Sequence, residues 1–151
     1  MRRITTALVL TLGAGCASIS TQQEAQMGAD YARQINAQLP IVRDAEINRY
    51  INALGDQIAR VADDRGIDFT FYVVNSPDVN AFAVPGGYIY INRGLIERAQ
   101  NMAQVAGVLG HEIAHVTERH SVEQMEKQQG AQLGLTLGCV LAPSVCNNQV
   151  G

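Results

Sequence analysis

One five-residue pattern constrains this chain more than any other feature. His111-Glu112-Ile113-Ala114-His115 matches H-E-x-x-H and continues a run of apolar residues at helical spacing, namely Val105, Val108, Leu109, Ile113 and Val116. Residues four apart on a helix project about 40° from each other, so both imidazoles can reach one metal ion. The pattern therefore predicts a long helix, from Asn101 to about Gln129, with a two-histidine metal site on one face.

The chemistry that this pattern favours is zinc-dependent hydrolysis. Neutral imidazole is a preferred zinc ligand, so we expect one Zn²⁺ per chain, bound by His111 and His115. Glu112 lies on the flank of the same helix face, where its carboxylate can act as the general base on a water activated by the metal. A buried pair of structural histidines explains this spacing, with a glutamate inside it, less well.

A third protein ligand is harder to find. A catalytic zinc site needs three protein ligands and an open fourth position. On one continuous helix, His120 falls on the side opposite His111, and Glu118 lies about two turns away from it. Glu123 and Glu126 lie still further along. The residues up to Gly151 thus predict no convincing third ligand.

The elements around this helix predict an α+β fold. Three further helices are expected, over 24–39, over 131–142, and from an N-cap at Asp44 to about residue 64. A short helix or turn is expected over 93–100, and Gly130 is expected to end the long helix. Strands are expected over 68–75, 81–84 and 88–92, the last two joined by a tight reversal at Pro85-Gly86-Gly87.

The first sixteen residues have the layout of a bacterial export signal. Two arginines precede an uncharged apolar run, and small residues lead to Cys16. We favour a lipoprotein signal, lipidated at Cys16, over an ordinary cleaved signal. The lipoprotein signal predicts a periplasmic protein anchored by lipid to the outer membrane. Residues 17–23 are then a polar linker, and 24–151 form the domain. In that compartment Cys139 and Cys146 form a disulfide or remain two buried thiols.

Charge excludes one large class of partner. The chain has 11 basic and 14 acidic residues, a net charge of −3 at pH 7, and its basic residues form no cluster. A nucleic-acid partner is therefore not expected.

Several sequence blocks together resemble a known family. These are Asn80 to Tyr90 (NAFAVPGGYIY), Gly94-Leu95, Ala106 to Val116 (AGVLGHEIAHV) and Arg119-His120. Over roughly residues 24–130 the chain resembles bacterial zinc metallopeptidases of the HtpX and CAAX-prenyl-endopeptidase type, and among them soluble periplasmic lipoproteins.

This resemblance implies a zincin-like fold, with the active-site helix packed on a small β-sheet and flanked by helices. It also implies zinc at His111 and His115, with Glu112 as catalytic base. The third ligand of the family is a glutamate on a later helix, and no matching residue is found up to Gly151. The resemblance therefore implies that the domain is incomplete at its C-terminus or has lost the site; we favour the first of these. In zincins an edge strand beside the active-site helix can pair with extended substrate, and the candidates here are Ala81, Phe82, Ala83 and Val84; the alternative is an ordinary hairpin that supports the core.

Two functions follow as hypotheses. The first is a zinc endopeptidase that cleaves misfolded or misassembled envelope proteins. The second is a non-proteolytic envelope lipoprotein, a chaperone or assembly factor that keeps the fold, and it rests on the missing third ligand.

Overall fold

The computed structural model describes residues 18–141, with side chains up to residue 131. The predicted export signal with its lipidation site Cys16 lies outside the described residues. So does Cys146, and the side chain of Cys139 is likewise not described, so the predicted disulfide stays a prediction.

A three-stranded sheet forms the middle layer. Its strands are β1 (Thr70–Val74), β2 (Ala81–Val84) and β3 (Tyr88–Asn92), in the order β1-β3-β2. β2 and β3 pair antiparallel across the predicted reversal, where Gly86 and Gly87 have φ angles of 80° and 95° that favour glycine. β1 pairs with β3 in parallel. The sheet therefore leaves β2 at one edge.

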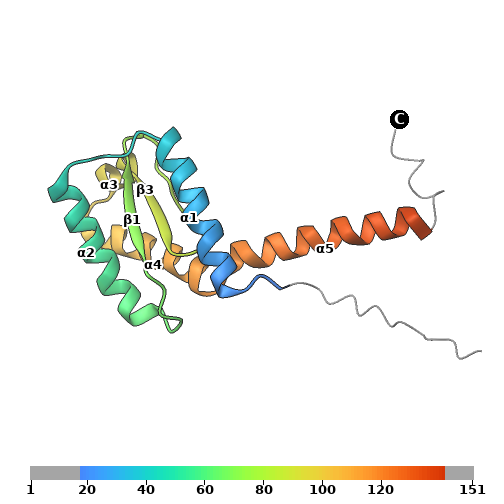
Figure 1. The fold of residues 1–151 in the computed structure, drawn as a ribbon. Helices are drawn as coiled ribbons and strands as arrows, with labels where there is room; N and C mark the ends of the chain where they lie inside the picture. The colour runs from blue at the N-terminus through green and yellow to red at the C-terminus, as the bar shows by residue number, and fades with distance from the viewer. Residues whose placement is uncertain (1–17, 142–151) are drawn as a thin grey trace, which may run out of the picture.

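Helices cover both faces of this sheet (Figure 1). On one face, α1 (Thr21–Gln38) packs over Tyr90, whose hydroxyl donates a hydrogen bond to Asn36 Oδ1 at 3.1 Å. On the other face, α2 (Ala45–Ala62) and α4 (Met102–Thr117) enclose the main core with the alternate residues of β1 and β3. The short α3 (Arg93–Arg98) follows β3 directly. This arrangement confirms the predicted α+β class, with the motif-bearing helix packed on a small sheet.

Capping residues determine where the first two helices begin. Ser20 and Gln23 form a reciprocal capping box, so α1 begins at Thr21 rather than at Glu24. The predicted linker over residues 17–23 is therefore wrong in its last three residues, which are helical. Asp44 accepts hydrogen bonds from the backbone N–H groups of Glu46 and Ile47, which confirms it as the N-cap of α2.

The single long helix predicted from Asn101 to about Gln129 is wrong. α4 ends at Thr117, and α5 (His120–Leu141) begins after a sharp bend in which Arg119 has φ 58°. This left-handed conformation costs free energy for a residue other than glycine, so contacts elsewhere must stabilise it. No glycine or proline lies at the bend, so the sequence pattern predicts a helix that continues through it.

The predicted break at Gly130 is also wrong, because α5 continues through it to Leu141. A glycine inside a helix costs only about 1 kcal/mol relative to alanine, which good helix formers on either side can offset.

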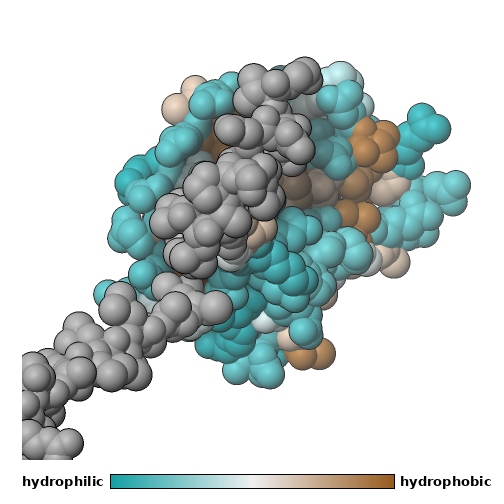
Figure 2. Space-filling view, turned by 90° about the vertical axis from the view of Figure 1, so that its right-hand side faces the viewer, coloured by the Kyte–Doolittle hydropathy of each residue, from teal (hydrophilic) through white to brown (hydrophobic). Residues whose placement is uncertain are grey.

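α5 projects away from the body of the molecule (Figure 1). Figure 2 views the molecule from the side toward which α5 projects. The surface on that side is mainly hydrophilic, and hydrophobic residues gather on one part of it. Within residues 18–141, no helix has the length and apolar character that crossing a membrane requires.

Candidate metal centre

The apolar stripe of α4 fixes which of its faces points outward. Its buried side chains are Val105, Leu109, Ile113 and Val116, which pack against α2 and the sheet. The side chain of Asn101 caps the helix by accepting a hydrogen bond from the backbone N–H of Gln104. With the stripe directed inward, His111, Glu112 and His115 remain on the partly exposed side. Helical periodicity thus presents the three predicted site residues to one side of the helix.

The two motif histidines converge as a metal pair would. Nε2 of His111 and Nε2 of His115 lie 3.0 Å apart, and the rings meet edge to face. Two imidazole nitrogens on a tetrahedral zinc, each bonded at about 2.0–2.1 Å, would lie about 3.3 Å apart. The separation and the donor type therefore both fit a zinc ion held by this pair.

A third protein ligand is not present among the described side chains. Within residues 18–131, no group of three or more His, Cys, Asp or Glu side chains is arranged to hold a metal. Two nearby glutamates have other partners: Glu126 accepts a hydrogen bond from the backbone N–H of Ile19, and Glu123 pairs with Lys127 at 2.7 Å. The hydrogen bond from Lys127, together with its charge, lowers the pKa of Glu123.

A groove connects the motif with the edge strand. It has a volume of about 610 Å³ and lies between β2, α4 and the first turns of α5. Its lining includes Ala81, Phe82 and Ala83 from β2, together with Glu112 and His115 from α4. His111 lies beside this lining, against His115. The structure thus brings three of the four candidate substrate-binding residues to the proposed catalytic base.

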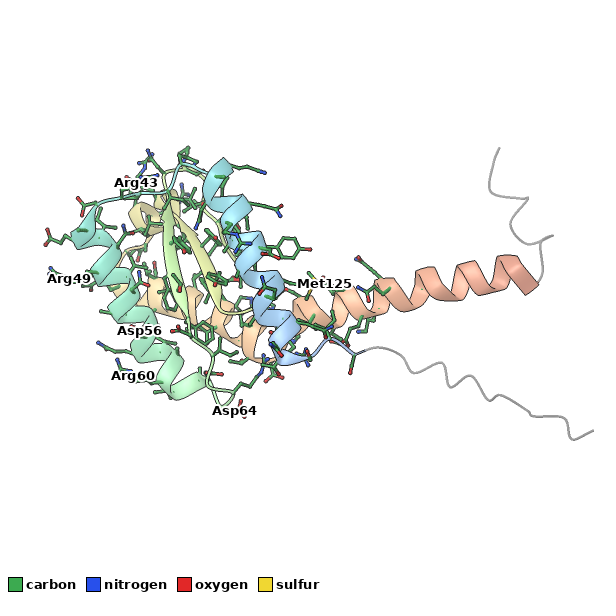
Figure 3. All side chains as sticks on the ribbon, in the orientation of Figure 1. Arg43, Arg49, Asp56, Arg60, Asp64 and Met125 are labelled. Carbon is green, nitrogen blue, oxygen red and sulfur yellow. The ribbon has the colours of Figure 1, made fainter. Side chains whose placement is uncertain are left out.

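The fourth candidate, Val84, lines an adjoining groove with Tyr31, Ile35 and Met125. Met125 lies where α5 leaves the body of the molecule, close to α1 (Figure 3). The two grooves share Ala83, Ser121 and Gln124. A chain that lies along β2 would therefore place residues in both grooves.

The register of β2 determines which of its backbone groups are free. The backbone N–H of Asn92 donates to the carbonyl of Asn80, and Phe82 lies opposite Tyr90. Hydrogen-bonded and non-hydrogen-bonded pairs alternate in an antiparallel ladder, so Asn80 and Phe82 bond to β3. The N–H and C=O groups of Ala81 and Ala83 then point away from β3, toward the open edge of the sheet.

A buried ion-pair network supports the C-terminal end of α4. Glu24 is 2% exposed, and its carboxylate binds Arg65 at 2.8 Å and Arg119 at 3.0 Å. Nη1 of Arg65 also donates to the carbonyl of Val116, in the last turn of α4. Arg119 also donates to the carbonyl of Ile19, so its guanidinium has a structural role. The sequence alone did not indicate Glu24 and Arg65, because these two residues and Arg119 lie far apart in the chain and no local pattern connects them.

The position of His120 differs from the one predicted. Because the helix bends after Glu118, His120 does not lie on the side opposite the motif. Its Nδ1 is 2.7 Å from Nδ1 of His115, and it lines the same groove. The adjacent Arg119 carries the only positive φ angle outside glycine among the described residues.

An H-E-x-x-H helix packed on a small sheet is the arrangement expected of a zincin-type metallopeptidase, and here Glu112 and His115 lie beside an edge strand. Comparison with known proteins agrees: the sequence profile of peptidase family M48 matches residues 42–150, and the chain belongs to this family. This confirms the resemblance to zinc metallopeptidases.

Several known proteins are similar to this chain. It is 41% identical over 113 residues to a "Beta-barrel assembly-enhancing protease" from Yersinia pestis and 38% identical over 112 residues to its namesake from Escherichia coli (strain K12); the matches cover 75% and 74% of this chain. It is also 40% identical over 83 residues to a "Mitochondrial metalloendopeptidase OMA1" from Arabidopsis thaliana, a match over 54% of this chain and 17% of that protein. The chain matches only 23% of the length of either bacterial relative.

Proposed function

We propose that this chain is the catalytic domain of a zinc-dependent endopeptidase of the bacterial cell envelope that cleaves misfolded or misassembled proteins. The observation that carries the proposal is the groove in which Glu112 and His115 meet the edge strand β2. Membership of family M48 supports the peptidase over the non-proteolytic alternative.

In this proposal each residue has a distinct role. His111 and His115 hold the metal through their Nε2 atoms, which already converge at 3.0 Å. A bound zinc ion supplies Lewis acidity, which polarises a peptide carbonyl and makes water a stronger acid. Glu112 accepts the proton of the attacking water as general base, and then delivers it to the leaving amine. The third metal ligand comes from outside the described side chains.

The edge of the sheet orients the substrate. An extended peptide adds a strand to β2 by hydrogen bonding to the outward backbone groups of Ala81 and Ala83. Backbone pairing of this kind needs an unfolded or locally open segment and is largely independent of sequence. This requirement favours misfolded proteins as substrates.

The place of action is inferred from two independent features. The relatives from Yersinia pestis and Escherichia coli are named for β-barrel assembly, and membrane β-barrels of bacteria lie in the outer membrane. The predicted export signal with Cys16 points to the same compartment. We therefore propose a periplasmic lipoprotein anchored at the outer membrane, with unfolded envelope proteins as substrates and no nucleic-acid partner.

The proposal is tested with the variant Glu112→Gln. We expect the zinc-loaded variant to cleave an unfolded protein such as β-casein at least about 100-fold more slowly than wild type, because the general base is lost. Its zinc content should stay that of wild type, since Glu112 is not a ligand. A matched control is Glu118→Gln, which removes an exposed carboxylate at the C-cap of the same helix, outside the groove. Cleavage by Glu112→Gln at the wild-type rate would contradict the mechanism.

A further inference from the structure

His120 lies behind one of the two metal-binding histidines. The ring of His115 offers Nε2 to His111 and Nδ1 to His120, at 3.0 Å and 2.7 Å. The two contacts therefore use opposite edges of one imidazole ring. Only the bend between α4 and α5 makes this possible, because a continuous helix would turn His120 away.

The bend is fixed by contacts that do not involve His120. Arg119 holds its left-handed backbone while Nε binds the buried carboxylate of Glu24, and Nη2 binds the carbonyl of Ile19. Arg65 joins the same carboxylate to the last turn of α4 through the carbonyl of Val116. The surrounding structure thus imposes the position of His120 beside His115.

A metal-binding imidazole needs a defined tautomer. When Nε2 binds the metal, Nδ1 carries the ring hydrogen, and a hydrogen-bond acceptor for that N–H fixes both the tautomer and the ring orientation. In the described part of the chain, Nδ1 of His115 is in contact with Nδ1 of His120, which can accept this hydrogen bond when its own ring hydrogen is on Nε2.

We propose that His120 is a positioning residue for the metal ligand His115. Nδ1 of His120 accepts the hydrogen bond from Nδ1–H of His115, which leaves the Nε2 lone pair of His115 directed at the metal. This inference rests on the proposed zinc site. It assigns a role to a histidine outside the H-E-x-x-H motif.

A role for His120 as the missing third ligand does not fit the geometry. His120 contacts the edge of His115 that faces away from His111, so it does not converge with the other two histidines. Consistent with this, the side chains described up to residue 131 contain no three-ligand group. Positioning and ligation therefore make different predictions for the loss of His120.

The test compares His120→Leu with His120→Asn. Leucine removes the acceptor, whereas the Oδ1 atom of asparagine has the same place along the side chain as Nδ1 of histidine. We expect the dissociation constant for zinc, measured by competition with a chromophoric chelator, to rise about 10- to 100-fold in His120→Leu and to be largely restored in His120→Asn. The control Glu118→Gln should bind zinc as wild type does.

A second readout distinguishes positioning from a general loss of structure. In the zinc-loaded wild type, ¹⁵N NMR of the imidazoles should show His115 with its hydrogen on Nδ1, and circular dichroism should show His120→Asn folded. An unchanged zinc affinity in folded His120→Leu would overturn the inference while leaving the zinc site intact. Loss of binding in both His120 variants as complete as in His115→Ala would overturn it in favour of ligation. A wild type that binds no zinc would overturn the proposed site and this inference together.

Discussion

The carboxylate of Glu24 accepts a hydrogen bond from Nε of Arg119 at 3.0 Å, although the two residues are 95 positions apart in the chain. Glu24 lies in the first turn of α1, and Arg119 forms the bend that follows α4, the helix with the H-E-x-x-H motif. Arg65, after α2, binds the same carboxylate. Three distant segments are thus joined at the C-terminal end of α4, next to the proposed active site.

Removal of the charge on Glu24 should destabilise the whole domain. The variant Glu24→Gln leaves two guanidinium groups near a buried site without their counter-charge, and we expect the free energy of unfolding to fall by about 3 kcal/mol. Urea unfolding followed by circular dichroism measures this change. The control Glu97→Gln breaks an exposed pair with Arg93 and should cost less than about 1 kcal/mol. Equal effects of the two substitutions would show that the buried network has no special role.

Tyr90 should make the stability of the domain sensitive to alkaline pH. Burial raises the pKa of its hydroxyl well above the ordinary value, and the neighbouring phenols of Tyr72 and Tyr88 raise it further. In the unfolded chain the tyrosine hydroxyl ionises at about pH 10, whereas at that pH the hydroxyl of Tyr90 in the folded protein stays protonated. The unfolded state then binds fewer protons, so stability falls as pH rises above about 10.

Replacement of Tyr90 by phenylalanine tests this. Above about pH 10, the unfolding free energy of Tyr90→Phe should fall less steeply with pH than that of wild type, by up to about 1.4 kcal/mol per pH unit. At pH 7 the same substitution should lower the unfolding free energy by about 1 kcal/mol, because the hydrogen bond to Asn36 is lost. Denaturant titrations across this pH range provide the measurement. Tyr50→Phe, at a position that is 54% exposed, should keep the wild-type slope. A Tyr90→Phe slope identical to that of wild type would refute the prediction.

The edge of β2 should contribute to substrate binding through its backbone. Ala83→Pro removes an N–H that points away from β3, so the ladder to β3 should survive, as it does for prolines on edge strands. We expect KM for an unfolded substrate to rise about fivefold, as for one lost hydrogen bond, with kcat and zinc content little changed.

The matched control places proline at the neighbouring position. Phe82→Pro removes an N–H that bonds to β3, and should therefore lower the midpoint of thermal unfolding much more than Ala83→Pro does. A folded Ala83→Pro variant with an unchanged KM would exclude strand addition at this edge.

Local patterns in the sequence predict much of this fold. Apolar periodicity locates α2 and the beginning of α4, and Asp44 marks the N-terminus of α2. The glycines at 86 and 87 locate the reversal between β2 and β3. The motif alone predicts that His111 and His115 converge, because the helix repeat sets their separation. The placement of β2 beside Glu112 followed from the resemblance to a family.

Features that depend on distant contacts could not be predicted in this way. The bend at Arg119 is stabilised by Glu24 and Ile19 from the other end of the described chain, so no residue near it signals the break. The position of His120 depends on that bend, and the expectation from one continuous helix was wrong for that reason. The beginning of α1 is different, because the capping box of Ser20 and Gln23 is a local signal: serine followed three residues later by glutamine is typical of a helix N-terminus and argues against a linker over all of residues 17–23.

The central claim, that α4 carries a zinc site, is tested most directly by the stoichiometry and affinity of zinc binding in wild type and in His115→Ala. The account predicts one zinc ion per protein molecule, lost in His115→Ala and retained in Glu112→Gln. Binding that persists unchanged in His115→Ala, or a wild type that binds no zinc, would contradict it.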